Sequence, residues 1–171
     1  MRVLIIVLKL FDPSAVPYAK AINYYANIHE FDPLLVVAVM YKESRFKNRC
    51  CYRGSYGLMQ IQLKERSCEK TEAEALRRKL YNPWVNIRDG VRMMAWWRKW
   101  GKGKSYHWLL HYNQGFGKCI DGGKECKFSK RKPITTGKIG GYAIRVLEIY
   151  QRLKTIERKH YEQQRKSREQ G

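Results

Sequence analysis

Apolar residues recur along the chain at steps of three and four positions, the spacing that places them on one face of an α-helix. One helix is expected to start at Ser14, whose side chain can cap it, and to run through Tyr18, Ile22 and Ala26. A last helix should begin near Gly141 and fray into the charged C-terminal tail. Between them, helices are expected over about 33–44, 71–80, 83–100 and 105–112. The pattern therefore predicts a mainly α-helical, single-domain protein with little or no β-sheet.

The helix expected over 33–44 has an unusual composition. Asp32-Pro33 supplies an N-cap residue followed by proline at the first helical position. From Leu34 through Met40 the sequence is apolar almost all round, which is typical of a helix buried on every side. Glu43 follows this run near the end of the helix.

Glu43 is a candidate general acid. Burial and the negative end of the helix dipole both disfavour a carboxylate, so we expect the pKa of Glu43 to be raised. A carboxyl that stays protonated near neutral pH can protonate a glycosidic oxygen. The local alternative is a surface glutamate that pairs with Lys42, Arg45 or Lys47, and local sequence alone favours that alternative.

The segments outside the helices suggest the domain limits. Residues 47–60 and 115–140 hold most of the glycines and cysteines and are expected to form loops. The apolar run 3–8 is shorter than the roughly 7–15 residues of a signal-peptide core, so a short strand or ordered arm is favoured over a leader. No other stretch approaches the length of a transmembrane helix. We expect an N-terminal arm or weak leader (1–13), a main domain (14–152) and a basic helical extension at the C-terminus (153–171).

Charge narrows the class of partner. The chain has 171 residues, 44% of them hydrophobic, which suffices for one packed core. Its formal net charge of +20 attracts polyanions such as nucleic acid, anionic membrane or bacterial wall polymers. Residues 98–138 alone carry eleven Lys or Arg against two acidic residues. No recognised nucleic-acid-binding motif accompanies this charge, and a merely solvated basic surface is the alternative.

Neither a metal site nor a cofactor is expected. The five cysteines include no Cys-x-x-Cys pair, and the four histidines show no zinc-like spacing. Cys119 and Cys126 close a short loop that a disulfide could bridge, although reduced, buried cysteines fit equally well. The odd number and the adjacent pair Cys50 and Cys51 leave at least one thiol free.

Several short motifs follow one another in a characteristic order. They are Glu43-Ser44-Arg45-Phe46, then Gly54 to Gln60, then Asn86-Ile87-x-x-Gly90, then His111-Tyr112-Asn113-Gln114-Gly115, and finally Tyr142 to Tyr150. Each motif alone is weak, but in this order they resemble the soluble lytic transglycosylase family, whose catalytic domain shares its fold with goose-type lysozyme. The resemblance runs from about Ser14 to Arg152 and implies a lysozyme-like domain with a substrate cleft.

The resemblance also implies roles for individual residues. Glu43 looks like the catalytic acid/base, and Ser44 resembles the hydroxyl that supports it. Tyr112 and Asn113 match a Tyr-Asn pair that helps to seat an N-acetylated sugar. Tyr142 matches a tyrosine close to the catalytic glutamate. Aromatic faces, amides and hydroxyls suit these tasks chemically.

The same resemblance assigns the segment Gly57-Leu58-Met59-Gln60 to the wall of the cleft. Glycine there would let the backbone approach the sugar, and Met59 and Gln60 would face the substrate. The chain departs from the family pattern nearby, because Ile61 to Lys64 replaces a usual proline-threonine sequence. Further departures are His111, Gln114, Lys138 and the basic insertion 118–138. They put fine substrate contacts in doubt more than the reaction class.

The tryptophans are kept out of the expected site. Trp96, Trp97 and Trp100 share a predicted helix, for which a role in the core or between helices is favoured. Trp84 and Trp108 could lie in the core or on the rim of a cleft.

The implied reaction is cleavage of the MurNAc-β-1,4-GlcNAc bond of peptidoglycan by one carboxyl, with attack by the sugar's own 6-hydroxyl and a 1,6-anhydro product. A hydrolytic muramidase on the same fold stays open, as does a non-catalytic basic module that binds wall or nucleic acid. The expected partners are peptidoglycan glycan strands and, through the basic surface, anionic wall polymers. We expect no specific nucleic acid, no transmembrane anchor and a monomer. The protein would act at the bacterial cell wall, with export by secretion or phage delivery left open.

Overall fold

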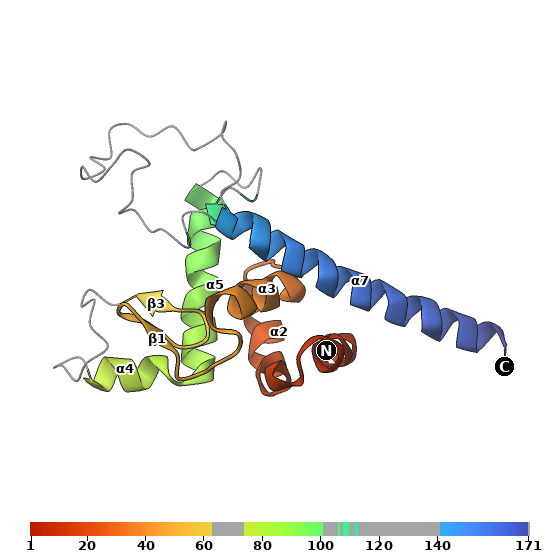
Figure 1. Cartoon of the computed structure of the whole chain (residues 1–171), viewed down its shortest axis with the longest axis horizontal. Coiled ribbons are helices and arrows are strands. Elements are labelled where there is room, and N and C mark those ends of the chain that lie inside the picture. Colours follow the sequence, from red (N-terminus) through yellow and green to blue (C-terminus); the bar gives the residue numbers. More distant parts are fainter. Residues whose placement is uncertain (63–73, 101–105, 107, 110–111, 113–140, 171) are drawn as a thin grey trace. The chain divides into compact units, whose positions relative to one another are not determined.

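The computed structural model describes residues 1–62, 74–100 and 141–170, together with residues 106, 108, 109 and 112. It is mainly helical with one small sheet, which confirms the predicted fold class (Figure 1). The helices are α1 (Arg2–Phe11), the 3₁₀ helix η1 (Pro13–Tyr18), α2 (Ala19–Ile28), α3 (Pro33–Ser44), α4 (Glu74–Leu80), α5 (Pro83–Trp100) and α7 (Gly141–Glu169). The strands are β1 (Cys51–Tyr52), β2 (Ser55–Tyr56) and β3 (Ile61–Gln62).

The chain forms two compact units. The first comprises Met1–Val91 and Val146–Gly171, and the second comprises Arg92–Arg145. Helices α5 and α7 each begin in one unit and end in the other. The limits expected from the sequence, 1–13, 14–152 and 153–171, stay a prediction.

The N-terminal segment is a helix, so the expectation of a short strand there is wrong. In α1 the side chains of Leu4, Val7 and Leu8 are buried, at the three- and four-residue spacing of one helical face. The next expected helix is also different, because it is two elements. Asp12 rather than Ser14 provides the cap, with its carboxylate accepting from the Ser14 amide at 3.0 Å, and η1 precedes α2.

Helix α3 forms as the sequence predicts. The Asp32 carboxylate accepts from the Leu34 amide at 2.9 Å, and Pro33 occupies the first turn. Residues 34–40 are all buried, so the apolar run fills the core. The same carboxylate binds α7 by accepting from the Tyr150 hydroxyl at 2.8 Å and from the Lys154 ammonium at 3.3 Å. One N-cap thus starts the helix and also anchors it.

The three strands form an antiparallel sheet in the order β1-β2-β3. Tyr52 pairs with Ser55, so Arg53 and Gly54 are the two central residues of a tight hairpin. Both have positive φ, 50° and 76°, as a type I′ turn requires. Tyr56 pairs with Ile61, and the connection between them is therefore the four-residue segment Gly57–Gln60.

Helices α5 and α7 begin where the sequence predicts. Asn82 caps α5 by accepting from the amides of Trp84 and Val85 at 3.0 and 3.3 Å. Helix α7 starts at Gly141 but continues to Glu169 rather than fraying, and ion pairs one turn apart, Arg165 with Glu169 among them, line its last turns. Within the described ranges, no helix combines the length and apolar content that a membrane span needs. The expected Thr71 cap and most of the helix expected over 105–112 lie outside the described residues.

Candidate active site

Glu43 lies in the last turn of α3, and its side chain is half-buried. The helix ends directly after Ser44, because Arg45 and Phe46 take the left-handed conformation with φ of 49° and 61°. This conformation is uncommon for residues other than glycine. Phe46 is buried, and its ring centroid lies 5.5 Å from that of Tyr41, so packing holds the bend. A buried helix therefore delivers a carboxyl to a point with partial access to solvent.

Ser44 connects the end of α3 to the segment Gly57–Gln60. Its side chain is buried, and its hydroxyl donates to the carbonyl of Leu58 at 2.8 Å, with the Met40 carbonyl at 3.3 Å. The residue that follows Glu43 thus bonds to the backbone of the β2-β3 connection. Since both partners are buried, the bond fixes where that connection lies relative to Glu43.

The connection Gly57–Gln60 is held internally as well. The Gly57 amide donates to the Cys50 carbonyl at 2.8 Å. The Gln60 side-chain nitrogen donates to the carbonyls of Cys50 and Gly57 at 3.2 and 2.9 Å. Gly57 has φ of 77°, and a Cβ there would lie 2.3 Å from the Asn86 amide nitrogen and 2.6 Å from the Leu80 carbonyl oxygen. Only glycine fits this position.

Asn86, on α5, holds the connection from the other side. It is fully buried, and its amide oxygen accepts from the Met59 amide at 2.7 Å. Its amide nitrogen donates to the carbonyls of Tyr56 and Leu80, both at 2.9 Å. Every one of these partners is a backbone group. Asn86 therefore replaces the hydrogen bonds that a regular strand or helix would give to this irregular segment.

Gly90 lies one turn further along α5 and makes room for Met59. A Cβ at Gly90 would lie 2.4 Å from the Met59 sulfur and 2.6 Å from its Cβ. The spacing of four residues places Asn86 and Gly90 on one face of the helix. The sequence motif Asn86-x-x-x-Gly90 alone indicates no role beyond a shared helix face. The structure gives the two residues one function, which is to seat residues 56–59.

Burial distinguishes among the four residues expected to form the wall of the cleft. Gly57 is buried, Leu58 and Met59 have no exposed surface, and Gln60 is partly exposed. Leu58 and Met59 therefore pack in the interior, and a contact between Met59 and the substrate stays a prediction. Of the segment, Gln60 alone presents surface. Its side-chain oxygen has no hydrogen-bond partner among the described residues, so it can accept one from a ligand.

The other candidate residues fall in the second unit or outside the described residues. Tyr112 is buried, Tyr142 is half-buried near the start of α7, and both belong to the unit Arg92–Arg145. Asn113 lies outside the described residues, as do the basic insertion 118–138, Cys119 and Cys126. The roles of these residues beside Glu43 stay predictions.

The remaining sequence candidates are placed as follows. Trp97 and Trp108 are buried, whereas Trp96 is 48% exposed. Trp84 is 43% exposed, and its ring centroid lies 6.0 Å from that of Tyr25. Cys51 is disulfide-bonded and Cys50 is a free thiol. In the part of the chain that the structure describes, no group of acidic, histidine or cysteine side chains is arranged to hold a metal ion.

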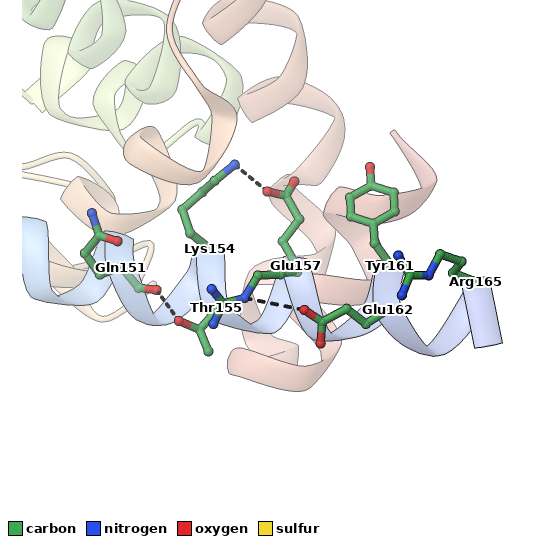
Figure 2. A pocket seen from close by; sticks show the side chains of 8 residues that line it. Gln151, Lys154, Thr155, Glu157, Tyr161, Glu162 and Arg165 are labelled. Atoms are coloured by element: carbon green, nitrogen blue, oxygen red, sulfur yellow. Dashed lines mark hydrogen bonds and ion pairs between the residues drawn. The ribbon is translucent and has the colours of Figure 1, made fainter.

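A hollow of about 440 Å³ along α7 does not resemble a catalytic site. Figure 2 shows its eight lining side chains, all between Gln151 and Arg165 on that one helix. Its cations face carboxylates, since Lys154 pairs with Glu157 and Arg158 lies 3.8 Å from Glu162. The hydrogen bond to Glu157 is the main reason that the pKa of Lys154 is raised, and the charge of Asp32 adds to the shift. Because these cations and carboxylates pair with one another, the hollow has little net charge with which to bind a ligand.

Comparison with known proteins agrees with this geometry. A family model described as Transglycosylase SLT domain matches residues 20–134, more than half of the chain. The match includes Glu43, the connection Gly57–Gln60, Asn86 and Tyr112, while Tyr142 lies beyond it. No curated protein and no solved structure matches the chain. The chain belongs to the transglycosylase SLT domain family, a lytic transglycosylase family that acts on the peptidoglycan of the cell wall.

Proposed function

We propose that this protein cleaves the MurNAc-β-1,4-GlcNAc bond of peptidoglycan, with Glu43 as both acid and base and a 1,6-anhydromuramoyl product. The observation that carries the proposal is the position of Glu43. It lies in the last turn of a helix whose residues 34–40 are all buried, keeps partial access to solvent and directly precedes the serine that bonds to the Leu58 carbonyl. A carboxyl at such a position is carried by a helix fixed in the core and still reaches the surface.

One carboxyl suffices if the nucleophile belongs to the substrate. Glu43 would protonate the leaving oxygen and then take the proton of the sugar's 6-hydroxyl, which attacks the anomeric carbon and closes the ring. Intramolecular attack needs no second carboxylate to activate water. Three other carboxylates, Asp89, Glu65 and Glu69, have no motif that places them opposite Glu43. Asp89 pairs with Arg88 at 2.8 Å, and Glu65 and Glu69 lie outside the described residues.

Sugar binding would use Gln60 and the three residues that the resemblance implies. Gln60 would accept a hydrogen bond from the sugar through its unpartnered side-chain oxygen, while the buried residues 57–59 keep Gln60 in place. Tyr112, Asn113 and Tyr142 would seat the N-acetylated sugar and orient the Glu43 carboxyl, as the resemblance implies. Ser44 would act through the backbone of Leu58 rather than on the substrate, because its hydroxyl is already donated.

The products test the reaction. Purified protein is incubated with peptidoglycan, and the soluble fragments are analysed by mass spectrometry. The proposal requires muropeptides one water lighter than the hydrolytic products. Muropeptides with an ordinary reducing end would instead establish a muramidase on this fold. Absence of any release, with the clearing of a wall suspension as a second readout, would favour a non-catalytic wall-binding module.

A substitution tests the catalyst. Glu43→Gln keeps the size of the side chain and removes the acid, so product release should fall by at least 10²-fold, the lower range for a general acid. Glu148→Gln is the matched control, since Glu148 is exposed on α7 and has no ion pair among the described residues. The thermal unfolding of both variants should match that of the unmodified protein. A folded Glu43→Gln variant with full activity would contradict the assignment.

A further inference from the structure

A second hollow, of about 500 Å³, lies in the first unit and has no place in the reaction described above. It is lined by Asn48, Arg49, Arg78, Tyr81 and Asn82. The residues come from the segment after α3 and from the junction between α4 and α5. Unlike the hollow along α7, its lining includes no acidic side chain.

The lining offers hydrogen-bond donors. Arg49 is exposed and has no ion pair among the described residues. Arg78 donates to Glu74 at 2.9 Å, but with the two side chains 78% and 49% exposed this pair contributes little, and a guanidinium keeps further N–H groups. Asn82 uses its oxygen to cap α5, so its amide nitrogen is left for a ligand. The Tyr81 hydroxyl adds another donor.

Asn48 also lines the hollow, but its amide oxygen is buried and has no hydrogen-bond partner among the described residues, so it is not counted among the donors. The remaining lining offers two guanidinium groups, the Asn82 amide nitrogen and a phenol. These donors suit an anionic ligand, and the paired N–H groups of a guanidinium match the geometry of a carboxylate.

Two residues that line the hollow are neighbours of the residues around the connection Gly57–Gln60. The Tyr81 ring lies against that of Tyr56 on β2, with centroids 5.9 Å apart. Arg49 directly precedes Cys50, whose carbonyl accepts from the Gly57 amide and the Gln60 side chain. A group bound here would therefore contact Arg49, which is one residue from the carbonyl that holds Gln60, and Glu43 is not among the lining residues.

We propose that this hollow binds the free carboxylate of the peptide stems that peptidoglycan carries on its sugars. The identity of the stem as the source rests on the proposed function, whereas the preference for an anion rests on the donors alone. The consequence is that the protein favours glycan strands that still bear peptides over strands that have been stripped of them.

Binding is tested with short peptides, apart from cleavage. The probes are a stem-type peptide ending in a free carboxylate, the same peptide with that carboxylate amidated, and inorganic phosphate, each titrated calorimetrically into the full chain. Arg49→Gln combined with Arg78→Gln should weaken the carboxylate peptide at least tenfold, as expected for lost bonds to a charged group. Arg53→Gln is the matched control, because Arg53 is an exposed arginine on the neighbouring hairpin turn, stacked on Tyr52.

Three results would overturn the proposal. Equal binding of the free and amidated peptides would show that no carboxylate is recognised. Equal loss in Arg53→Gln would show attraction by overall charge rather than by the hollow. Tighter binding of phosphate than of the peptide would assign the hollow to phosphate-bearing polymers. In all three cases the cleavage chemistry at Glu43 would be unaffected.

Cleavage supplies the functional readout. On strands that bear peptides, the double arginine variant should raise KM about tenfold and leave kcat within twofold, and on stripped strands it should behave as the unmodified protein does. An equal change on both kinds of strand would contradict a peptide subsite. If no strand is cleaved by any form of the protein, the proposed function fails, while the peptide titration still decides the hollow.

Discussion

Replacing Asn86 by alanine tests the reasoning about the site most directly. The substitution leaves the Met59 amide and the carbonyls of Tyr56 and Leu80 without the partners they have at 2.7, 2.9 and 2.9 Å. Asn86 has no exposed surface, so water cannot replace it without a rearrangement. Leaving a buried polar group unpaired costs about 1–3 kcal/mol each. Since neighbouring atoms relax in part, we expect a total loss of about 3–5 kcal/mol.

This loss is large against the roughly 5–15 kcal/mol that stabilises a folded domain. Urea unfolding, followed by circular dichroism and by tryptophan fluorescence, measures it. Because the chain forms two compact units, agreement of the two signals is needed before one free energy of unfolding is assigned. Asn27→Ala is the control, an exposed asparagine on α2 for which a change within about 0.5 kcal/mol is expected. A loss below about 1 kcal/mol for Asn86→Ala would refute the role given to Asn86.

Asn86→Asp separates the acceptor from the two donors. The introduced carboxylate can still accept from the Met59 amide, but it faces the carbonyl oxygens of Tyr56 and Leu80. Burial and these oxygens should raise its pKa above the ordinary value of about 4. A raised pKa means that the folded state favours the protonated form, so the variant is least destabilised below about pH 4 and loses stability as the pH rises toward the raised pKa. Unfolding at pH 4.5 and 7.5 should therefore show a larger deficit at 7.5, and an equal deficit would contradict the geometry.

Three further substitutions test neighbouring contacts. Gly90→Ala should lower the free energy of unfolding by about 1–2 kcal/mol, because overpacking against Met59 exceeds the helix-propensity gain of about 1 kcal/mol. Combined with Met59→Ala, it should cost less than the sum of the two single losses. Simple additivity in urea unfolding would contradict the contact. Ser44→Ala should lower the free energy of unfolding by about 1–2 kcal/mol, because it leaves the buried Leu58 carbonyl unpaired. The control Ser14→Ala, at an exposed serine, should cost less than about 0.5 kcal/mol. Equal losses in the two variants would exclude the hydrogen bond. Asp32→Asn should lower the free energy of unfolding by less than about 1 kcal/mol, because asparagine caps a helix as well as aspartate does and the ion pair with Lys154 is partly exposed. A larger loss in thermal unfolding would mean that this ion pair stabilises the fold more than its exposure allows.

The elements that the sequence predicted well are those whose signals are local. The cap at Asp32 followed by proline, and the cap at Asn82, depend on hydrogen bonds to residues two and three positions away. Such local signals can be recognised in the sequence without knowledge of the fold. The first helix was missed because a short apolar run does not distinguish a strand from a helix, and the burial of Leu4, Val7 and Leu8 is decided by what packs against them.

The site shows the same division. The place of Glu43 at the end of a buried helix follows from the sequence of that helix alone. The burial of Met59 does not, because it depends on Gly90, and the bonds of Asn86 reach residues 27 and 30 positions away. A methionine in a loop next to a glutamine is expected to be exposed, because the sequence does not show that Gly90 lies opposite and leaves space for it. Sequence reasoning therefore places Glu43 on its helix, but it cannot anticipate which residues pack beneath the connection Gly57–Gln60.

These contacts explain why the motifs occur together. Ser44 follows Glu43 and binds the Leu58 carbonyl, Met59 beside it binds Asn86, and Gly90 accommodates the Met59 side chain. The three motifs are thus successive links between α3 and α5 that pass through one four-residue connection, rather than three separate contributions to binding. A loss at any link should displace Gln60 relative to Glu43. Variants at Asn86, Gly90 or Ser44 that still fold should therefore lose cleavage activity without any direct contact between the changed residue and the sugar.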